Sequence, residues 1–238
     1  MRERLCREFG LSLEPQETAR LVQFDLALPD GQAVHLAGVL GPVHADASGG
    51  QVLLGPSRDM FRMSDYLLAW VQYLAGLVTQ PDGRPWSVVL PLSAQAAKQP
   101  AWLGFGPALE RDESRAPTAV RDAASARAEL VRLVGRWQQI RQVPSRVYGA
   151  TALAWLQASN GDQTVDRDSP AWGKAWEAWQ GNTFIGRPGE ADDRWSKALW
   201  RDDPPDLQQV LQDSLSLYGP IWLSAQGAIA SERQERDD

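Results

Sequence analysis

The strongest constraint on the fold lies in the first 92 residues, where short alternating segments surround one broadly apolar helix. "LVQFDLAL" at 21–28 places apolar residues at every second position, and "PDG" follows it as a turn. "AVHLAGVLGPVHA" at 33–45 predicts a second strand, and "QVLL" at 51–54 predicts a short third one. When every second residue is apolar, one face of a strand can pack against a core. These segments therefore predict three successive strands.

The segment "SDYLLAWVQYLAGLV" at 64–78 is apolar along two adjacent helical stripes. Such breadth predicts a helix that is buried on most of its circumference. "PDGRP" ends that helix, and "WSVVLPL" at 86–92 predicts a fourth strand, buried on both faces. With a short helix at the N-terminus, the predicted order is helix, three strands, helix, strand. We therefore expect an α/β (α+β) fold whose mixed sheet has about four strands flanked by helices.

The rest of the chain predicts a helical extension. We expect a core over 1–95, a long loop over 96–122 without sustained periodicity, helices packed on the same core over 123–226, and a flexible tail over 227–238. "SARAELVRLVGRWQQIRQ" at 125–142 aligns apolar residues from Leu130 to Ile140, Trp137 among them, on one side of a helix.

Composition excludes several classes of protein. The chain of 238 residues has one cysteine and two histidines, which excludes an intrachain disulfide and a Cys- or His-rich metal centre, and we expect no cofactor. No apolar run approaches the roughly 18 to 20 residues of a membrane span, and no signal-peptide pattern opens the chain, so we expect a cytoplasmic protein without a membrane. The net charge of −6 restricts any contact with nucleic acid to a local basic surface.

The predicted order of elements is similar to the core of the PD-(D/E)xK nuclease superfamily. In that superfamily the second strand ends in Asp, and the third carries an acidic residue and, two positions later, Lys. Two carboxylates hold a cation that stabilises the phosphoryl transition state, and the Lys helps to position water. In this chain the three positions hold Gly41, Gly55 and Ser57. Neither Asp46 nor Asp59 lies in the required register, so the resemblance implies a nuclease-like fold without catalytic residues and without a bound metal.

A more specific resemblance follows from the order of further motifs. "HLAGVL", "GPSRDMFRMSD" and "YLLAWVQYLAGL" are followed by "ELVRLVGRWQQIRQVP", "AWGKAWEAWQG" and "ADDRWSKALWRDD". Over residues 20 to 224 this order resembles the C-terminal domain of RecC, the gamma chain of exodeoxyribonuclease V. The resemblance implies RecB-like and RecD-like helicase subunits as partners, with double-stranded DNA ends or a displaced single strand as the nucleic acid. It implies a role in DNA repair by homologous recombination. The helicase-like domains of RecC have no counterpart here, which places Chi recognition by this chain in doubt.

Two sets of residues are candidates for binding. Arg58 and Arg62 follow the emptied strand end, where they would meet a phosphate or a strand junction, although a solvated pair at a helix entry is the favoured interpretation. Five C-terminal tryptophans are candidates for partner binding: Trp172, Trp176, Trp179, Trp195 and Trp200. For Trp137 and the others at helical spacing, packing in a core or an interface is favoured over base stacking.

Two hypotheses of function remain open besides an active metal-dependent nuclease, which is the weakest. In the first, the chain is a noncatalytic DNA-handling module that supports DNA end processing and strand separation. In the second, it is a protein-docking module that does not contact DNA directly. The acidic segment "GRPGEADD" at 186–193 is compatible with a cation site, but a solvated turn with an N-capping Asp is favoured.

Overall fold

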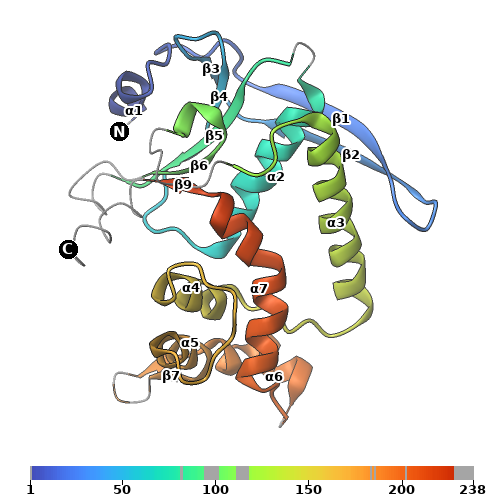
Figure 1. The fold of residues 1–238 in the computed structure, drawn as a ribbon, viewed down its shortest axis with the longest axis vertical. Helices are drawn as coiled ribbons and strands as arrows, with labels where there is room; N and C mark the ends of the chain where they lie inside the picture. Colours follow the sequence, from blue (N-terminus) through green and yellow to red (C-terminus); the bar gives the residue numbers. More distant parts are fainter. Residues whose placement is uncertain are drawn as a thin grey trace. The chain divides into compact units, whose positions relative to one another are not determined.

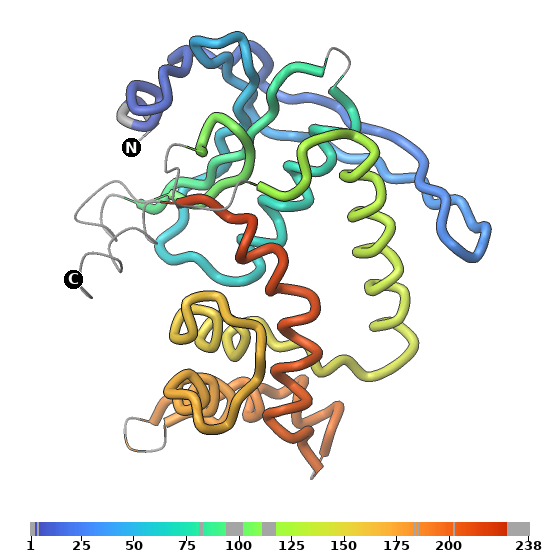
Figure 2. Tube along the Cα trace, in the orientation of Figure 1, coloured from blue at the N-terminus to red at the C-terminus, as the bar shows by residue number. Residues whose placement is uncertain are grey.

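The computed structural model describes residues 2–80, 83–93, 102–110, 118–182, 184, 186–201 and 203–227. It divides into two compact units, and Figure 2 traces the chain through both. The first unit comprises Met1–Phe61, Asp65–Gln138 and Ser224–Asp238, and the second comprises Arg62–Ser64 and Gln139–Leu223. Nearly all of the predicted tail lies outside the described residues, and the four-part domain division remains a prediction.

Among the described residues, the first unit contains the five-stranded sheet, the paired strands β1 and β2, three α-helices and one short 3-10 helix. Its elements are, in chain order, α1 (Arg2–Glu8), β1 (Arg20–Ala27), β2 (Ala33–Leu40), β3 (Val43–Ala45), β4 (Gln51–Leu54), α2 (Met63–Thr79), β5 (Trp86–Pro91), β6 (Trp102–Phe105), η1 (Pro107–Leu109), α3 (Ala123–Gln142) and β9 (Gln226–Gly227). The first residues of α2 and the last of α3 belong to the second unit.

Five strands form one mixed sheet in the order β3-β4-β5-β6-β9. β4 and β5 run parallel, as their connection through α2 requires, and the other neighbours run antiparallel. The predicted α+β class with a mixed sheet is therefore confirmed. The fifth strand, β9, has only two residues, which are too few for a periodic pattern to predict a strand.

The predicted first and second strands form a separate two-stranded ribbon. β1 and β2 pair antiparallel from Arg20↔Leu40 to Ala27↔Ala33, and Figure 1 shows their far end projecting beyond the sheet. The second strand breaks at Pro42, which has no N–H to donate to a ladder, and resumes as β3. Val43 then donates to the Glu17 carbonyl oxygen at 2.9 Å, so the segment before β1 is joined to the five-stranded sheet.

The core of the first unit lies on both faces of the sheet. On one face, Phe9 in the turn after α1 meets Trp102 edge to face, with ring centroids 5.1 Å apart. On the other face, Trp70 of α2 packs against Phe105 of β6 at 4.9 Å. Because side chains alternate along β6, Trp102 and Phe105 point to opposite faces. β4 and β5 are consequently buried along their whole length, as predicted for the fourth strand.

The second unit is mainly helical. It contains α4 (Gly149–Ala158), α5 (Pro170–Gln180), β7 (Gly181–Asn182), β8 (Arg187–Pro188), η3 (Glu190–Asp192), α6 (Arg194–Trp200) and all of α7 (Leu207–Ser224) except its last residue. Ser169 accepts a hydrogen bond from the Ala171 N–H and so caps α5, which begins with Pro170. The acidic segment has capping roles: Asp193 caps α6, and the Glu190 carboxylate accepts from the Thr151 N–H at 2.8 Å at the start of α4.

Among the described residues, no helix combines the length and the apolar character that crossing a membrane requires.

Candidate functional site

The positions that the nuclease pattern assigned to two carboxylates, Gly41 and Gly55, lie just before β3 and just after β4. β3 and β4 pair antiparallel with Val43 opposite Leu53, and the Pro42 carbonyl oxygen accepts from the Leu54 N–H at 3.2 Å. Continuing this register by two residues places Gly41 opposite Gly55. Directly opposed residues of an antiparallel pair present their side chains on the same face. The two positions assigned by the sequence pattern therefore fall opposite each other when the register is continued.

The two glycine positions differ in the space around them. A Cβ atom at Gly55 would clash with Leu90 Cδ2, so the side chain of a buried β5 leucine fills the space beside this glycine. No heavy atom lies within 4 Å of a Cβ atom at Gly41. Position 55 is therefore closed by core packing, whereas position 41 is open.

Arg58 is fixed by its own neighbours at this edge. Its backbone N–H donates to the Pro91 carbonyl oxygen at 2.9 Å, which extends the parallel pairing of the sheet beyond β4. Its Nε lies 2.8 Å from Asp65 Oδ1 in the first turn of α2, where the arginine is half-buried and the carboxylate is largely buried. The arginine thus has a structural partner. Ser57 and Arg62 are exposed, and no contact of Arg58 or Arg62 with DNA is tested by this geometry.

The two aspartates near the strand ends have structural roles. Asp46 Oδ1 accepts hydrogen bonds from the N–H groups of Ser48 and Gly50, both at 2.8 Å, and so closes the turn between β3 and β4. Asp59 Oδ1 accepts from the Ser93 hydroxyl at 3.1 Å. Neither carboxylate belongs to a group of three or more potential metal ligands, because no such group occurs among the described residues.

Both histidines contact atoms away from the strand ends. His35 Nδ1 lies 2.8 Å from Asp25 Oδ1, its cross-strand neighbour in the ribbon. His44 is fully buried, and its Nδ1 lies 2.8 Å from the Ser12 carbonyl oxygen. These contacts favour a structural role for both imidazoles over a role as the base of a nucleophile such as Ser57.

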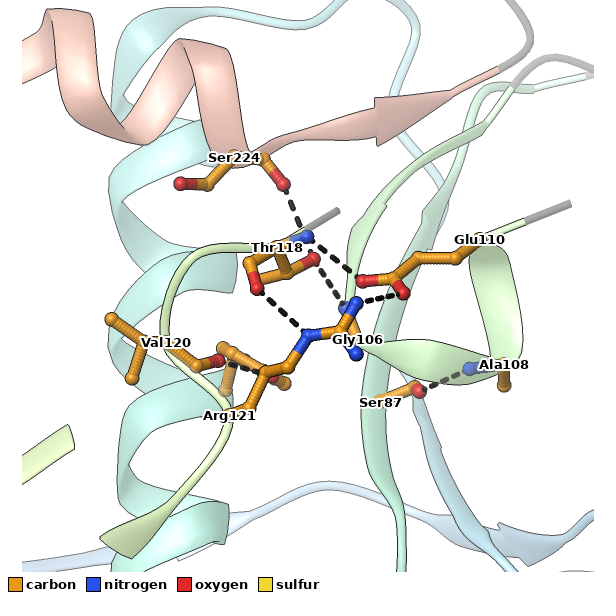
Figure 3. A network of polar contacts seen from close by, with 9 residues as sticks. Ser87, Gly106, Ala108, Glu110, Thr118, Val120, Arg121 and Ser224 are labelled. Carbon is orange, nitrogen blue, oxygen red and sulfur yellow. Dashed lines mark hydrogen bonds and ion pairs between the residues drawn. The ribbon is translucent and has the colours of Figure 1, made fainter. Parts of the chain in front are cut away.

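A polar network joins residues 118–121, at the end of the predicted 96–122 loop, to the sheet (Figure 3). Glu110 accepts from the Thr118 N–H at 2.8 Å and forms an ion pair with Arg121. The Thr118 hydroxyl contacts the Gly106 N–H at 3.3 Å and the Ser224 carbonyl oxygen at 3.4 Å. These contacts join the segment after η1 to the sheet and to the chain that enters β9. The arrangement is one of structural support.

Tyr73 of α2 also holds the segment that contains Thr118 and Arg121. Its hydroxyl donates to the Val120 carbonyl oxygen at 2.7 Å. Burial raises the pKa of the Tyr73 hydroxyl well above its ordinary value, and the nearby charge of Glu110 adds to the effect. The group therefore remains a protonated donor throughout the physiological range.

The C-terminal tryptophans divide into buried and exposed side chains. Trp179 is buried, Trp172 and Trp200 are half-buried, and Trp176 and Trp195 are exposed by 49% and 69%. All five belong to the second unit. Helical spacing had favoured a core or an interface for Trp176, and its exposure excludes the core. Binding of a partner at these residues remains a prediction.

Helix α3 holds a group of residues that sequence reasoning missed. Its 20 residues include four arginines and one glutamate, a bias that was visible in the sequence. Only Ala126 and Leu130 are buried in it, and Trp137 is 55% exposed. Every residue of its C-terminal half is half-buried or exposed, so the aligned apolar residues form no core there, and packing of Trp137 in an interface remains a prediction.

Comparison with known proteins connects this geometry to one family. Residues 7–160 match the model of the RecC C-terminal domain, and the matched segment includes the ribbon, β3 to β6, α2, α3 and α4. No curated protein matches the chain.

Proposed function

Because the chain belongs to the RecC C-terminal domain family, which associates it with RecBCD-type DNA repair, we propose that it is a noncatalytic domain that supports DNA end processing, strand separation and subunit docking. The observation that carries the noncatalytic part is the pair of strand ends. Gly41 and Gly55 fall opposite each other when the β3–β4 register is continued by two residues, and Leu90 fills the space beside Gly55. Without two carboxylates at this edge, a cation for phosphoryl transfer has no ligands there.

The test is a cleavage assay on the purified chain. Linear double-stranded and single-stranded DNA, end-labelled, are incubated with Mg²⁺ or Mn²⁺, and products are resolved on a denaturing gel. We expect no cleavage above a buffer control. Metal-dependent degradation that disappears in Asp46→Asn or Asp59→Asn would contradict the alignment, because it would show that one of these carboxylates serves the chemistry.

A second experiment asks whether the lost site can be rebuilt. Gly41→Asp, Gly55→Asp and Ser57→Lys are combined, and Mn²⁺ binding is measured by isothermal titration calorimetry. We expect some gain of metal affinity and little activity, because the groups that would orient the new ligands are absent. Adding Leu90→Ala to this variant provides room for the aspartate introduced at position 55. Equal metal affinity with and without Leu90→Ala would contradict the role given to that leucine.

Docking to a partner subunit is the alternative function, and the exposed indoles of the second unit favour it. Trp176 and Trp195 are both exposed, and tryptophan is among the residues enriched at interfaces. Acrylamide quenching of fluorescence, compared across single Trp→Phe variants, tests their accessibility. Removal of Trp195 should lower the quenched fraction, whereas removal of buried Trp179 should raise it. Shielding of all five C-terminal tryptophans in a monomer would remove this docking face.

A further inference from the structure

The ribbon of β1 and β2 has two strand edges that no other strand of the described chain covers. Among the described residues, β1 and β2 pair only with each other, and the far end of the ribbon projects beyond the five-stranded sheet (Figure 1). A strand at the edge of a sheet has a row of N–H and C=O groups on its outer side without partners in the sheet. Such a row is a template on which a further strand can pair.

The hydrogen bonds of the hairpin show which backbone groups point outward. The Leu28 N–H donates to the Gln32 carbonyl oxygen at 2.8 Å, and these two residues continue the register beyond the pair Ala27↔Ala33. In an antiparallel ladder, pairs that exchange hydrogen bonds alternate with pairs that do not. The even-numbered residues of β2 therefore bond to β1. The backbone groups of its odd-numbered residues, from Ala33 to Val39, point away from the ribbon.

The outer edge of β1 is partly occupied, and that of β2 is open. The carbonyl oxygen of Asp25, an odd-numbered residue of the same ladder, accepts from Arg127 Nη1 of α3 at 3.0 Å. This contact agrees with the alternation and places α3 at the edge of β1. On β2, no hydrogen bond between described residues reaches the outward backbone groups of Ala37 or Val39.

The edge of β2 also lacks the features that usually prevent strands from pairing there. Lysine, proline and bulges protect many natural edges. The eight residues of β2 contain no Lys, Arg, Asp, Glu or Pro, and the register with β1 runs without a bulge. Val39 is 64% exposed, and its cross-strand partner Leu21 is 70% exposed. An apolar pair therefore lies exposed beside an open edge, a combination that suits the addition of an extended segment.

Charge indicates what kind of segment this edge fits. Two acidic side chains of the ribbon, Asp25 and Asp30, are exposed. Arg20 is the only arginine or lysine over residues 20–40, and its side chain is largely buried and ion-paired. His35 lies 2.8 Å from Asp25. This distribution disfavours nucleic acid and favours a segment that carries lysine or arginine.

We propose that the outer edge of β2 binds an extended, basic segment of a partner protein as an added strand. The inference rests on the subunit docking included in the proposed function and deepens it by naming the surface and the conformation of the bound segment. The added strand would bond to the outward backbone groups from Ala33 to Val39. It would also place an apolar side chain beside Val39 and Leu21, which are cross-strand neighbours.

The first test needs no ligand. Amide hydrogen exchange of the isotope-labelled chain is followed by NMR. The amides of Leu36 and Gly38, which bond to β1, should exchange at least about tenfold more slowly than the outward amides of Ala37 and Val39. Comparable protection of the two sets would show that the edge is covered in the free protein and would overturn the proposal.

Binding is measured with a synthetic peptide of about nine residues, in which threonine and valine alternate between two terminal lysines. At saturation it should slow exchange of the Ala37 and Val39 amides at least about tenfold. A peptide with the same side chains but N-methylated amides cannot donate hydrogen bonds and should bind at least about tenfold more weakly. Glutamate in place of both lysines should weaken binding about threefold at low salt. Equal affinity of the methylated peptide would overturn strand pairing, and equal affinity of the acidic peptide would overturn the basic character of the segment.

A pair of proline variants tests the edge from the side of the protein. Ala37→Pro removes an outward N–H without removing a bond to β1, and it should weaken peptide binding at least about fivefold. Gln23→Pro is the matched control, because Gln23 lies directly opposite Ala37 and its N–H points outward from the other edge of the ribbon. Its expected effect is below about twofold, and circular dichroism verifies that both variants fold. Equal weakening by the two variants would overturn the proposal.

The remaining outcomes separate this proposal from the proposed function. Failure of the unmethylated peptide to bind would overturn strand addition at β2, but would leave docking through the tryptophans of the second unit intact. A dimer in sedimentation velocity that is lost in Ala37→Pro would assign the edge to a second copy of this chain and overturn the partner proposed here. DNA cleavage by the chain would contradict the noncatalytic assignment without bearing on the edge of β2.

Discussion

Helices α2 and α3 both align apolar residues at helical spacing, yet α2 is mostly buried and the C-terminal half of α3 is not. In α2, Trp70 is 2% exposed and packs against both Tyr73 and Phe105. In α3, burial ends after Leu130, and Trp137 is 55% exposed. A helical period identifies which face is apolar. Only the elements that pack on that face decide whether its residues form a core or a surface for binding.

The largest expected difference in the free energy of unfolding is between substitutions of Trp70 and of Trp137. Trp70→Ala should lower the free energy of unfolding by about 3 to 5 kcal/mol, because it leaves a cavity beside Phe105 and removes a hydrogen bond to Glu129. Trp137→Ala should change it by about 0.5 kcal/mol or less. Urea denaturation followed by circular dichroism measures both. Similar losses in the two variants would show that α3 is covered in solution and would remove the contrast.

The strand ends offer the same contrast at smaller scale. Gly55→Asp should cost about 1 to 3 kcal/mol, since its side chain must displace Leu90 and is partly buried. Gly41→Asp, which meets no atom within 4 Å, should be close to neutral. Thermal and urea denaturation of the two single variants decide this. Equal stability of the two variants would mean that Leu90 can move aside without loss of stability, and that position 55 accepts a side chain as readily as position 41.

A smaller loss is expected at the start of the covered helix. Asp65→Asn should destabilise the chain by about 1 kcal/mol, because it removes the ion pair with Arg58 and a negative charge near the N-terminus of α2. Asp59→Asn is the matched control, as its carboxylate is exposed and accepts from the Ser93 hydroxyl, which a neutral amide oxygen can also do. A loss at position 59 equal to that at position 65 would attribute the effect to net charge alone.

The smallest effect concerns the segment that joins the ribbon to the sheet. A hydrogen bond from Arg20 to the Glu17 carboxylate, with a weaker contribution from their opposite charges, holds the pKa of Glu17 below its ordinary value of 4.5. A lowered folded-state pKa contributes stability above pH 4.5 that is lost as the pH falls through the folded value. The stability difference between wild type and Glu17→Gln should therefore be constant from about pH 7 to 5 and shrink in more acidic solution. The same comparison in an Arg20→Gln background should show no such change, because the hydrogen bond that lowers the pKa is absent there.

Part of the candidate site was accessible from sequence. The alternating strands, the broad apolar stripe of α2 and the missing carboxylates at Gly41 and Gly55 were all local patterns, and the register of β3 and β4 agrees with the last of these. Pro42 is also a local signal for a break in the second strand, but the sequence analysis predicted one continuous strand over residues 33–45. Within the predicted helical extension, no separate helix was assigned to the residues of α4. The N–H groups at its start donate to Glu190, about 40 positions later in the chain, so no local capping residue marks its beginning.

What the sequence determined by itself is the set of periodic elements, their order, the absence of acidic residues at the strand ends and the charge bias of α3. Those properties are local, because they follow from the spacing of side chains along one segment. Tertiary structure alone decided that Leu90 occupies the space beside Gly55, that Asp65 engages Arg58, and that Trp137 is exposed while Trp70 is buried. The reason is physical: burial and pairing depend on atoms brought from distant parts of the chain, and a periodic pattern carries no information about which of those atoms will arrive.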